Sequence, residues 1–483
     1  MPLPASPLSR PRRPSLRTLG ALSFCMLVSA GAAAQQPLPA GVDAALARAR
    51  VPRDAVTMLV ADADGARPPR LAWRTQAPVN PASIMKLVTT YAALDLLGAG
   101  YTWTTPVYVD GTVNNGVLDG NLYIQGQGDP KLVIERLWLL LRHVQGLGIA
   151  TVNGDIVIDC GAFENTAEND PAAFDGEPLR PYNASPDALL VNFKSVNMRF
   201  APDRAGHFAR VSYEPPLANV AMPQTVALAP GECGDWRTAL RGDFSDPNRI
   251  RFDGGFPAAC GEKSWAVAYA DPRSYGLRAI GGLWAEMGGR IGGRIREGQV
   301  PPGLKPAFEF ASPPLPEVIR DINKYSNNVM AQQLFLTIGL TQRNQGTFEA
   351  SRAALGQWWR ERIGTGEAPP VFENGSGLSR DERISAAALG RMLQVAWRSP
   401  VMPELMASLP ALGVDGTLKK RALRAGVAAH LKTGTLRDAS GVAGYVHAAS
   451  GRRYVLVAIA SGENAAAARA AFDALVDWTA QDN

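Results

Sequence analysis

Three short segments hold the residue types that could do covalent chemistry. They are Ser-Ile-Met-Lys at 83–86, Ser-Asn-Asn at 326–328 and Lys-Thr-Gly-Thr at 432–435. Each pattern is common by itself, but the three in this order are typical of proteins that attack an acyl group with a serine activated by a lysine. The expected division of work is a nucleophile on the first segment, a proton relay on the second and an anion clamp on the third.

The first segment places a serine and a lysine three residues apart. On a helix Ser83 and Lys86 lie on one face, and Ser83 falls in the first turn, where the helix dipole favours negative charge. A serine hydroxyl is a weak nucleophile until a neighbour removes its proton. We expect Lys86 to remove it, which requires burial or a second cation to lower the lysine pKa. The apolar sequence that follows would bury Lys86, and Lys432 would be the second cation. The alternative interpretation is that a Ser-x-x-Lys pair, taken alone, is an ordinary helical face.

The second segment has a competitor, Ser-Val-Asn at 195–197, which alternates like a strand. Ser326 and Asn328 instead lie in a helical context, where a hydroxyl and an amide two residues apart cannot share a face, so we expect a local break. Ser326 would pass a proton from Lys86 to a leaving amine, and Asn328 would hold Lys86 and a substrate carbonyl. The alternative interpretation of Ser326 is a polar cap between two helices.

The third segment is predicted to be a strand beside the nucleophile helix. Lys432 with the hydroxyls of Thr433 and Thr435 is expected to bind a carboxylate, and Gly434 to let an extended substrate approach the backbone. The amides of Thr435 and Ser83 would form an oxyanion hole. A Ser-His-Asp site has little support, because no Gly-x-Ser-x-Gly occurs and the four histidines are scattered.

The elements that must position these segments lie in two regions with different sequence patterns. The sequence predicts an α/β (α+β) domain made of residues 35–100 and 302–483. Its expected elements are strands at 57–62 and 71–74, a buried helix after residue 80, a long helix at 316–338 and a hairpin at 442–448 and 454–461. The strand near Val56 and that hairpin can pair only if the two ends of the chain meet in one sheet. Residues 101–301 are predicted to be a β-rich insertion with a smaller domain nested at about 190–270. Its predicted strands lie at 105–110, 121–125, 151–159, 190–193, 197–201 and 209–213, and its helices at 132–147 and 275–287.

The amino terminus is predicted to be a signal peptide. Four arginines precede the apolar run 19–28, and small residues with an Ala-x-Ala pattern follow up to residue 34. The run is shorter than the roughly 20 residues that span a bilayer, although an anchored helix is the alternative. Removing residues 1–34 takes four arginines from the formal charge of +5 and leaves about +1 (5 − 4). We therefore expect a periplasmic protein with no integral membrane segment and no nucleic-acid partner.

Cysteine and histidine usage predicts a disulfide and no metal. In an oxidising compartment Cys233 and Cys260 are the natural pair, and Cys160 is left as a buried free thiol at a strand end. No Cys-x-x-Cys occurs, and the histidines are far apart in sequence, so we expect neither a metal nor another cofactor.

With these motifs the chain resembles the class C low-molecular-mass penicillin-binding proteins, the serine-type D-Ala-D-Ala carboxypeptidase/endopeptidase family. The resemblance also covers segments 119–130, 182–189 and 374–380, and the long gap between the first two motifs. It implies a β-lactamase/transpeptidase-like catalytic domain, an antiparallel sheet between helix layers, with a two-part insertion. The implied partners are peptidoglycan stem peptides, whose terminal D-Ala-D-Ala is hydrolysed, and β-lactam inhibitors that acylate Ser83. Many relatives also cut D-Ala-to-diaminopimelate cross-links. The sequence does not decide whether the chain forms a homodimer.

By position in this resemblance, Asp175, Arg380 and Arg437 fall where relatives contact the free end of diaminopimelate. Arg437 departs from the neutral amide expected there, and surface charges in loops are the alternative for all three. Two competing functions are a β-lactamase or esterase on the same fold, which fast deacylation would reveal, and a non-catalytic peptidoglycan-binding protein. An intact set of motifs argues against the latter.

Overall fold

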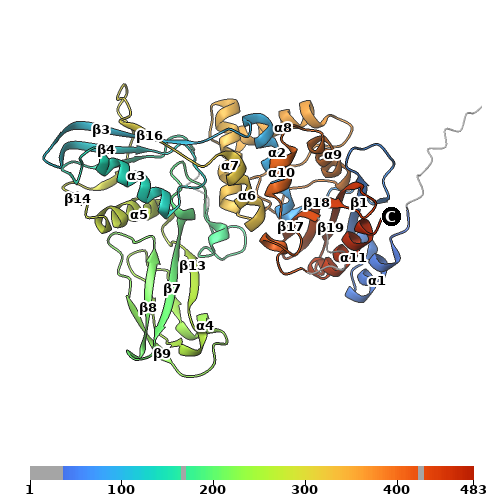
Figure 1. Ribbon diagram of the computed structural model, residues 1–483, viewed down its shortest axis with the longest axis horizontal. Coiled ribbons are helices and arrows are strands. Elements are labelled where there is room, and N and C mark those ends of the chain that lie inside the picture. The colour runs from blue at the N-terminus through green and yellow to red at the C-terminus, as the bar shows by residue number, and fades with distance from the viewer. Residues whose placement is uncertain (1–35, 165–169, 422–428, 483) are drawn as a thin grey trace, which may run out of the picture. The chain divides into compact units, whose positions relative to one another are not determined.

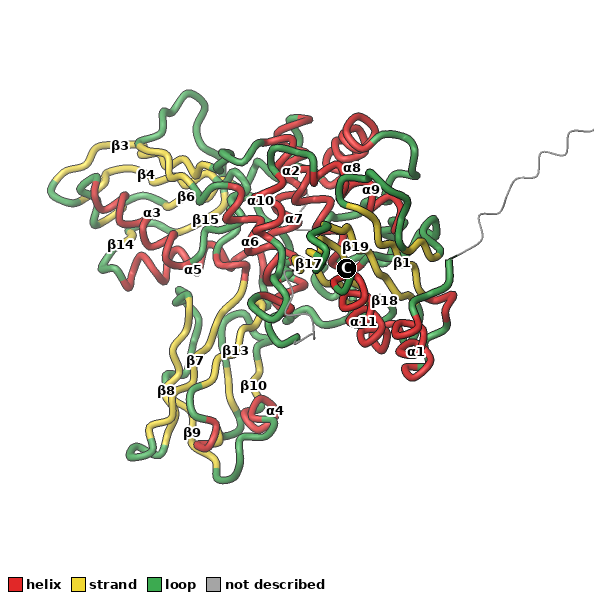
Figure 2. The backbone as a smooth tube through the Cα atoms, turned by 45° about the vertical axis from the view of Figure 1, so that its right-hand side comes forward, coloured by secondary structure: helices red, strands yellow, loops and turns green. Residues whose placement is uncertain are grey.

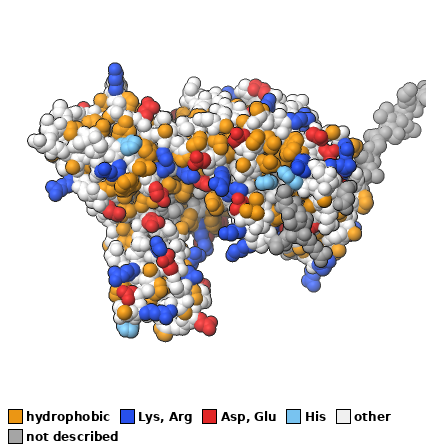
Figure 3. Space-filling view, viewed as in Figure 1, with side chains coloured by type: hydrophobic (Ala, Val, Ile, Leu, Met, Phe, Trp, Pro, Cys, Tyr) orange, Lys and Arg blue, Asp and Glu red, His pale blue; other side chains and the backbone are white. Residues whose placement is uncertain are grey.

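A computed structural model describes residues 36–164, 170–421 and 429–482. The predicted signal peptide lies outside these residues. Within the described part of the chain, no helix is both long and apolar enough to cross a membrane. On the face in Figure 3, basic and acidic side chains are interspersed.

The three motifs are carried by a five-stranded antiparallel sheet and the helices packed on it (Figures 1 and 2). The strand order is β17-β18-β19-β1-β2, and Val56 of β1 lies opposite Ala460 of β19, which confirms that the two chain ends meet in one sheet. The strands are β1 (Val56–Asp62), β2 (Leu71–Trp73), β17 (Ala429–Thr435), β18 (Ala439–His447) and β19 (Arg453–Ser461).

Both faces of this sheet are buried, so its strands are apolar on both sides. Met58 and Val60 of β1 face a layer of α1 (Ala40–Ala49) and α11 (Arg469–Ala480). Leu59 faces the opposite layer, in which α2 (Lys86–Leu97), α6 (Leu315–Tyr325), α7 (Asn328–Arg343) and α9 (Ala386–Trp397) pack. The antiparallel sheet between helix layers expected from sequence is therefore confirmed (Figure 2).

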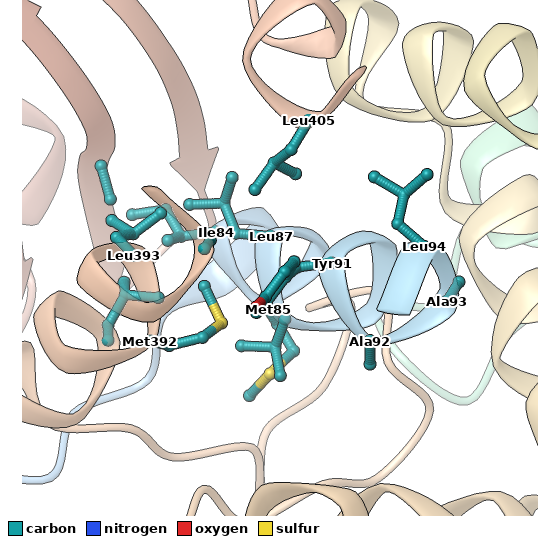
Figure 4. Packing of buried hydrophobic residues seen from close by; sticks show 14 of the residues in the cluster. Ile84, Met85, Leu87, Tyr91, Ala92, Ala93, Leu94, Met392, Leu393 and Leu405 are labelled. Carbon is teal, nitrogen blue, oxygen red and sulfur yellow. The ribbon is translucent and has the colours of Figure 1, made fainter. Parts of the chain in front are cut away.

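The helix after the first motif is buried all round, as its sequence predicts. It begins with a 3₁₀ turn, Ala82–Met85, that continues directly into α2. Apolar side chains of α2 such as Leu87 and Tyr91 pack among Met392, Leu393 and Leu405 of neighbouring helices (Figure 4). The motif is thus anchored in the centre of the hydrophobic core.

The long helix predicted at 316–338 is wrong, because two helices replace it. The first, α6 (Leu315–Tyr325), ends at Ser326, whose φ of 59° lies in the left-handed region, and α7 (Asn328–Arg343) follows. The break that the motif requires therefore divides the element. The helices that follow are α8 (Phe348–Trp358) with a π turn at Trp359–Ile363, α9 (Ala386–Trp397) and α10 (Met402–Ser408).

The segment between α2 and α6 forms two large sheets and a two-stranded one (Figure 1). One seven-stranded sheet carries α3 (Ile134–Gly146) and α5 (Pro272–Glu286). Its strands are β3 (Thr104–Asn114), β4 (Val117–Gln125), β5 (Thr151–Val152), β6 (Ile156–Asp159), β14 (Arg290–Ile291), β15 (Ile295–Glu297) and β16 (Phe308–Ala311).

The second of these sheets has the order β12-β9-β8-β7-β13. A two-stranded sheet and α4 (Trp236–Leu240) accompany it. Its strands are β7 (Ser195–Asp203), β8 (Phe208–Glu214), β9 (Thr225–Ala229), β12 (Phe256–Pro257) and β13 (Lys263–Ala268); the pair is β10 (Gly242–Asp243) and β11 (Arg251–Phe252). The strand predicted at 190–193 is wrong: Asn192–Lys194 is a 3₁₀ turn in which Phe193 has a φ of 57°. The boundaries 101–301 and 190–270 stay predictions.

The cysteines pair as the sequence indicates. Cys233 and Cys260 form a disulfide. Cys160 is a free, partly buried thiol directly after β6, and burial together with the nearby carboxylate of Asp187 raises its pKa.

Candidate active site

The first motif is built around the side chain of Lys86, which is fully buried at the start of α2. Its Nζ lies 3.0 Å from Oγ of Ser83, 2.6 Å from Oδ1 of Asn328 and 2.5 Å from the carbonyl oxygen of Ser376. An ammonium has three N–H donors, so these three oxygens match its full capacity. The first and second motifs therefore meet at one nitrogen atom.

The surroundings of Lys86 favour its neutral form. Burial lowers its pKa well below the usual value, the charge of Lys432 lowers it further, and the carboxylate of Glu382 opposes them. Burial disfavours a charged amine because water no longer solvates it. A lysine with this depressed pKa can accept the proton of the Ser83 hydroxyl 3.0 Å away.

The third motif contributes a second fully buried lysine, Lys432 of β17. Its Nζ lies 3.0 Å from Oγ of Ser326 and 2.6 Å from the carbonyl oxygen of Thr433. Burial lowers the pKa of Lys432 to about 7. The second and third motifs therefore meet through Ser326, which can exchange a proton with either its lysine neighbour or a bound substrate.

The break between α6 and α7 aims both residues of the second motif at these lysines. Asn327, and not Ser326, caps α7, since its Oδ1 accepts a hydrogen bond from the N–H of Met330 at 3.1 Å. Ser326 adopts the left-handed conformation, and Asn328 follows as the first residue of α7. Asn328 also donates from Nδ2 to the carbonyl oxygen of Tyr182 at 3.1 Å, which holds its Oδ1 toward Lys86.

Two glycines let the backbone of other segments contact the residues before Ser83. A Cβ on Gly377 would lie 1.9 Å from the carbonyl oxygen of Ala82, and one on Gly434 would lie 2.7 Å from that of Pro81. Ala82 itself has a φ of 48°, a conformation that costs an alanine about 1 kcal/mol or more. Ser83, the predicted nucleophile, thus follows a strained turn that is enclosed by backbone on two sides.

The rest of the third motif lies along the edge strand β17. Gly434 is buried, Thr433 is half-buried and Thr435 is exposed. Oγ1 of Thr433 lies 2.8 Å from Oγ1 of Thr417, so a second hydroxyl outside the motifs stands beside it. Hydroxyls, a lysine and a glycine at a sheet edge suit an extended peptide that ends in a carboxylate.

The structure also brings in groups that the sequence did not single out. They are the backbone carbonyls of Ser376 and Tyr182, the hydroxyl of Thr417 and the carboxylate of Glu382. Ser376 lies in segment 374–380, which carries part of the family resemblance, but the residue of that segment with a predicted role is Arg380. A backbone carbonyl has no signature in a sequence, so only the resemblance could have drawn attention to this loop.

The three residues predicted at a second substrate pocket, Asp175, Arg380 and Arg437, do not all lie at one cavity. A cavity of about 400 Å³ is lined by Asp170, Phe174 and Arg380 among others. Arg380 donates to Oδ1 of Asp438 at 3.2 Å, and its guanidinium carbon lies 4.2 Å from the ring centre of Phe174.

Asp175 and Arg437 do not line this cavity. Asp175 accepts hydrogen bonds from the Tyr182 hydroxyl at 2.9 Å and from Nδ2 of Asn183 at 2.7 Å. Although burial opposes the effect, these hydrogen bonds lower the pKa of Asp175. Arg437 is exposed in the turn after β17. Of the three predicted residues, only Arg380 lies at the cavity.

Comparison with known proteins identifies the chain over nearly its whole length. The model of the D-Ala-D-Ala carboxypeptidase 3 (S13) family matches residues 38–482. A D-alanyl-D-alanine carboxypeptidase of Actinomadura sp. (strain R39) is 28% identical over 382 residues, which cover 76% of this chain and 70% of that protein.

Two solved structures share the fold. Penicillin binding protein 4 of Haemophilus influenzae is 22% identical, with a TM-score of 0.68, and the match covers 86% of this chain and 94% of that one. A predatory endopeptidase of Bdellovibrio bacteriovorus, acylated by penicillin G and in complex with an immunity protein, is 15% identical, with a TM-score of 0.51, and the match covers 89% and 93%. With the family model spanning residues 38–482, the chain belongs to the D-Ala-D-Ala carboxypeptidase 3 (S13) family and is a serine-type D-Ala-D-Ala carboxypeptidase.

Proposed function

We propose that the chain is a periplasmic carboxypeptidase and endopeptidase that cleaves peptidoglycan stem peptides through an acyl-enzyme on Ser83, and that penicillin acylates the same serine. The observation that carries this proposal is the position of Lys86. Its fully buried Nζ lies within hydrogen-bond distance of Ser83 and Asn328. A protein that only binds peptides gains nothing from a buried lysine beside a serine, since burial of an amine is costly.

In the first step, neutral Lys86 takes the proton of Ser83 while Oγ attacks the carbonyl carbon of the penultimate D-Ala. Negative charge develops on the carbonyl oxygen, and the amides of Ser83 and Thr435 are proposed to stabilise it. The bond to the leaving amine then breaks as the amine takes a proton through Ser326. An ester on Ser83 remains, and the free D-Ala departs.

In the second step, Lys86 takes a proton from water as the water oxygen attacks the carbonyl carbon of this ester. The bond to Oγ of Ser83 then breaks, Oγ receives that proton, and the shortened peptide leaves as a carboxylic acid. Lys432 does not act as a base in this scheme, but holds the terminal carboxylate of the substrate. Since its pKa is about 7 in the substrate-free site, Lys432 is a mixture of charged and neutral forms near neutral pH. A bound carboxylate favours the charged form, because opposite charges in contact stabilise each other.

Endopeptidase activity is supported by the cavity at Arg380. Its volume of about 400 Å³ and its charged and aromatic lining suit a polar side chain of a cross-linked stem. Export to the periplasm is supported by the sequence of residues 1–34. β-Lactam binding is supported by the penicillin adduct of the Bdellovibrio structure with the same fold.

The test is the intact mass of the mature protein after incubation with benzylpenicillin, beside Ser83→Ala. We expect one penicillin adduct on the wild type and none on the variant, and release of D-alanine from a stem pentapeptide by the wild type only. Penicillin that disappears without an adduct would indicate a β-lactamase. Intact penicillin and no adduct would leave a binding protein and contradict the proposal.

A further inference from the structure

A buried carboxylate organises the loop that binds Lys86. Glu382 is fully buried, and its Oε1 accepts hydrogen bonds from three consecutive backbone N–H groups. The distances are 3.2 Å to Glu373, 3.2 Å to Asn374 and 2.8 Å to Gly375. The N–H of Glu382 in turn donates to Oγ of Ser379 at 3.0 Å. The chain from 373 to 382 is therefore closed around one oxygen atom.

This loop fixes one of the three oxygens around Lys86. The next residue after the three amides, Ser376, presents its carbonyl oxygen to Nζ of Lys86 at 2.5 Å. The carbonyl of Gly375 accepts from Oγ1 of Thr89, one turn further along α2, at 2.6 Å. Glu382 thus binds the N–H of Gly375 and Thr89 binds its carbonyl, and the position of the neighbouring Ser376 carbonyl depends on both.

The chemistry of Glu382 indicates that its charge matters as well as its shape. Its second oxygen, Oε2, is buried without a hydrogen-bond partner among the described residues. A neutral glutamine would serve the three amides equally well, and burial of a carboxylate with a bare oxygen is costly. Burial raises the pKa of Glu382, its three backbone hydrogen bonds oppose this shift, and the nearby carboxylate of Glu373 adds to it. When ionised, Glu382 favours the charged form of Lys86, whereas Lys432 disfavours it.

We propose that Glu382 is a positioning residue for acyl transfer: it holds the Glu373–Ser376 loop, and with it the Ser376 carbonyl oxygen, against Lys86, and its negative charge acts on the same lysine. The inference rests on the proposed reaction at Ser83. Glu382 itself touches neither Ser83 nor the place of the substrate. Its influence on Lys86 runs through the Ser376 carbonyl and through space.

The test separates charge from geometry with two near-isosteric variants. Glu382→Gln keeps an oxygen for the three amides but removes the charge. Since the charge of Glu382 raises the pKa of Lys86, we expect the acid limb of the acylation rate with benzylpenicillin to move to lower pH, by on the order of one pH unit. Thr89→Val removes the hydrogen bond to the Gly375 carbonyl without a charge change. We expect it to lower the acylation rate by about tenfold with the acid limb unmoved.

The control is Glu361→Gln, the same chemical change at an exposed residue of the Trp359–Ile363 turn, which should leave rate and pH profile unchanged. Thermal unfolding of each variant reports whether the fold is intact. An unmoved acid limb in folded Glu382→Gln would overturn the role of charge, and an unchanged rate in Thr89→Val would overturn the role of the loop. A wild type that forms no penicillin adduct at all would instead refute the proposed function.

Discussion

Nζ of Lys86 lies 2.6 Å from Oδ1 of Asn328, although the two residues are 242 positions apart in the chain. The contact joins the buried α2 to the first residue of α7, and the carbonyl of Tyr182 holds the other end of the same amide. One asparagine therefore orients the proposed base and ties it to a loop of the inserted region.

Replacement of Asn328 should affect the rate and the pH profile in different ways. We expect Asn328→Ala to reduce the penicillin acylation rate by about 10²-fold, the size of effect typical of a disturbed general base. Asn328→Asp adds a negative charge beside Lys86, which raises its pKa, so the acid limb should move to higher pH. This direction is opposite to that expected for Glu382→Gln. Rates measured by mass spectrometry from pH 5 to 9, in about 0.5-unit steps, would test both signs, and a shift of the Asp variant to lower pH would contradict the role of Asn328.

The two Ser-x-Asn segments can be distinguished by matched alanine variants. Ser326→Ala removes the hydroxyl that contacts Lys432, and we expect the release of D-alanine from a pentapeptide to fall by about 10²-fold or more. Ser195→Ala removes a hydroxyl that donates to the carbonyl of Phe193 at the start of β7, and turnover should stay at the wild-type level. Equal losses in the two variants would show that Ser326 has no special role.

A methyl group at Gly377 should disturb the turn before the nucleophile. Gly377→Ala places a Cβ 1.9 Å from the Ala82 carbonyl, and its φ of 79° is unfavourable for alanine. Gly303→Ala is a matched control, because Gly303 has a φ of 82° but open space around its Cβ position. We expect both variants to lose about 1 kcal/mol of unfolding free energy through the backbone. Only Gly377→Ala should lose penicillin acylation as well, and acylation at the wild-type rate would contradict this view of the turn.

The depressed pKa of Lys432 predicts a pH-dependent stability. Its pKa is about 7 in the folded protein against 10.5 in the unfolded chain. Between these values the unfolded state binds more protons, so the free energy of unfolding should rise with pH, by up to about 1.4 kcal/mol per pH unit from this residue.

Lys432→Met should flatten that rise, which urea unfolding at pH 7.5, 8.5 and 9.5 (a span of about two units) would measure. The lost charge also raises the pKa of Lys86, which acts in the same direction. Parallel pH curves for the wild type and the variant would show that Lys432 titrates normally in the folded protein.

The sequence by itself determined the family, the sheet that joins the chain ends and the disulfide. The order and the spacing of the Ser83, Ser326 and Lys432 motifs can be read directly from the sequence. Pairing of β1 with β19 follows from alternating and apolar runs, because a strand with two apolar faces must lie inside. These features depend on residue type and period, which a sequence displays directly.

Only the tertiary structure decided how the site is assembled. The left-handed φ of Ser326, the carbonyls of Ser376 and Tyr182 and the carboxylate of Glu382 arise from backbone that other segments fix in place. By its position in the sequence, Asp175 is predicted to contact substrate; in the structure its carboxylate accepts hydrogen bonds from Glu177, Tyr182 and Asn183 and lies outside the lining of the cavity at Arg380. A sequence shows which side chains are available, whereas the direction of a carbonyl or carboxylate depends on packing between segments hundreds of residues apart.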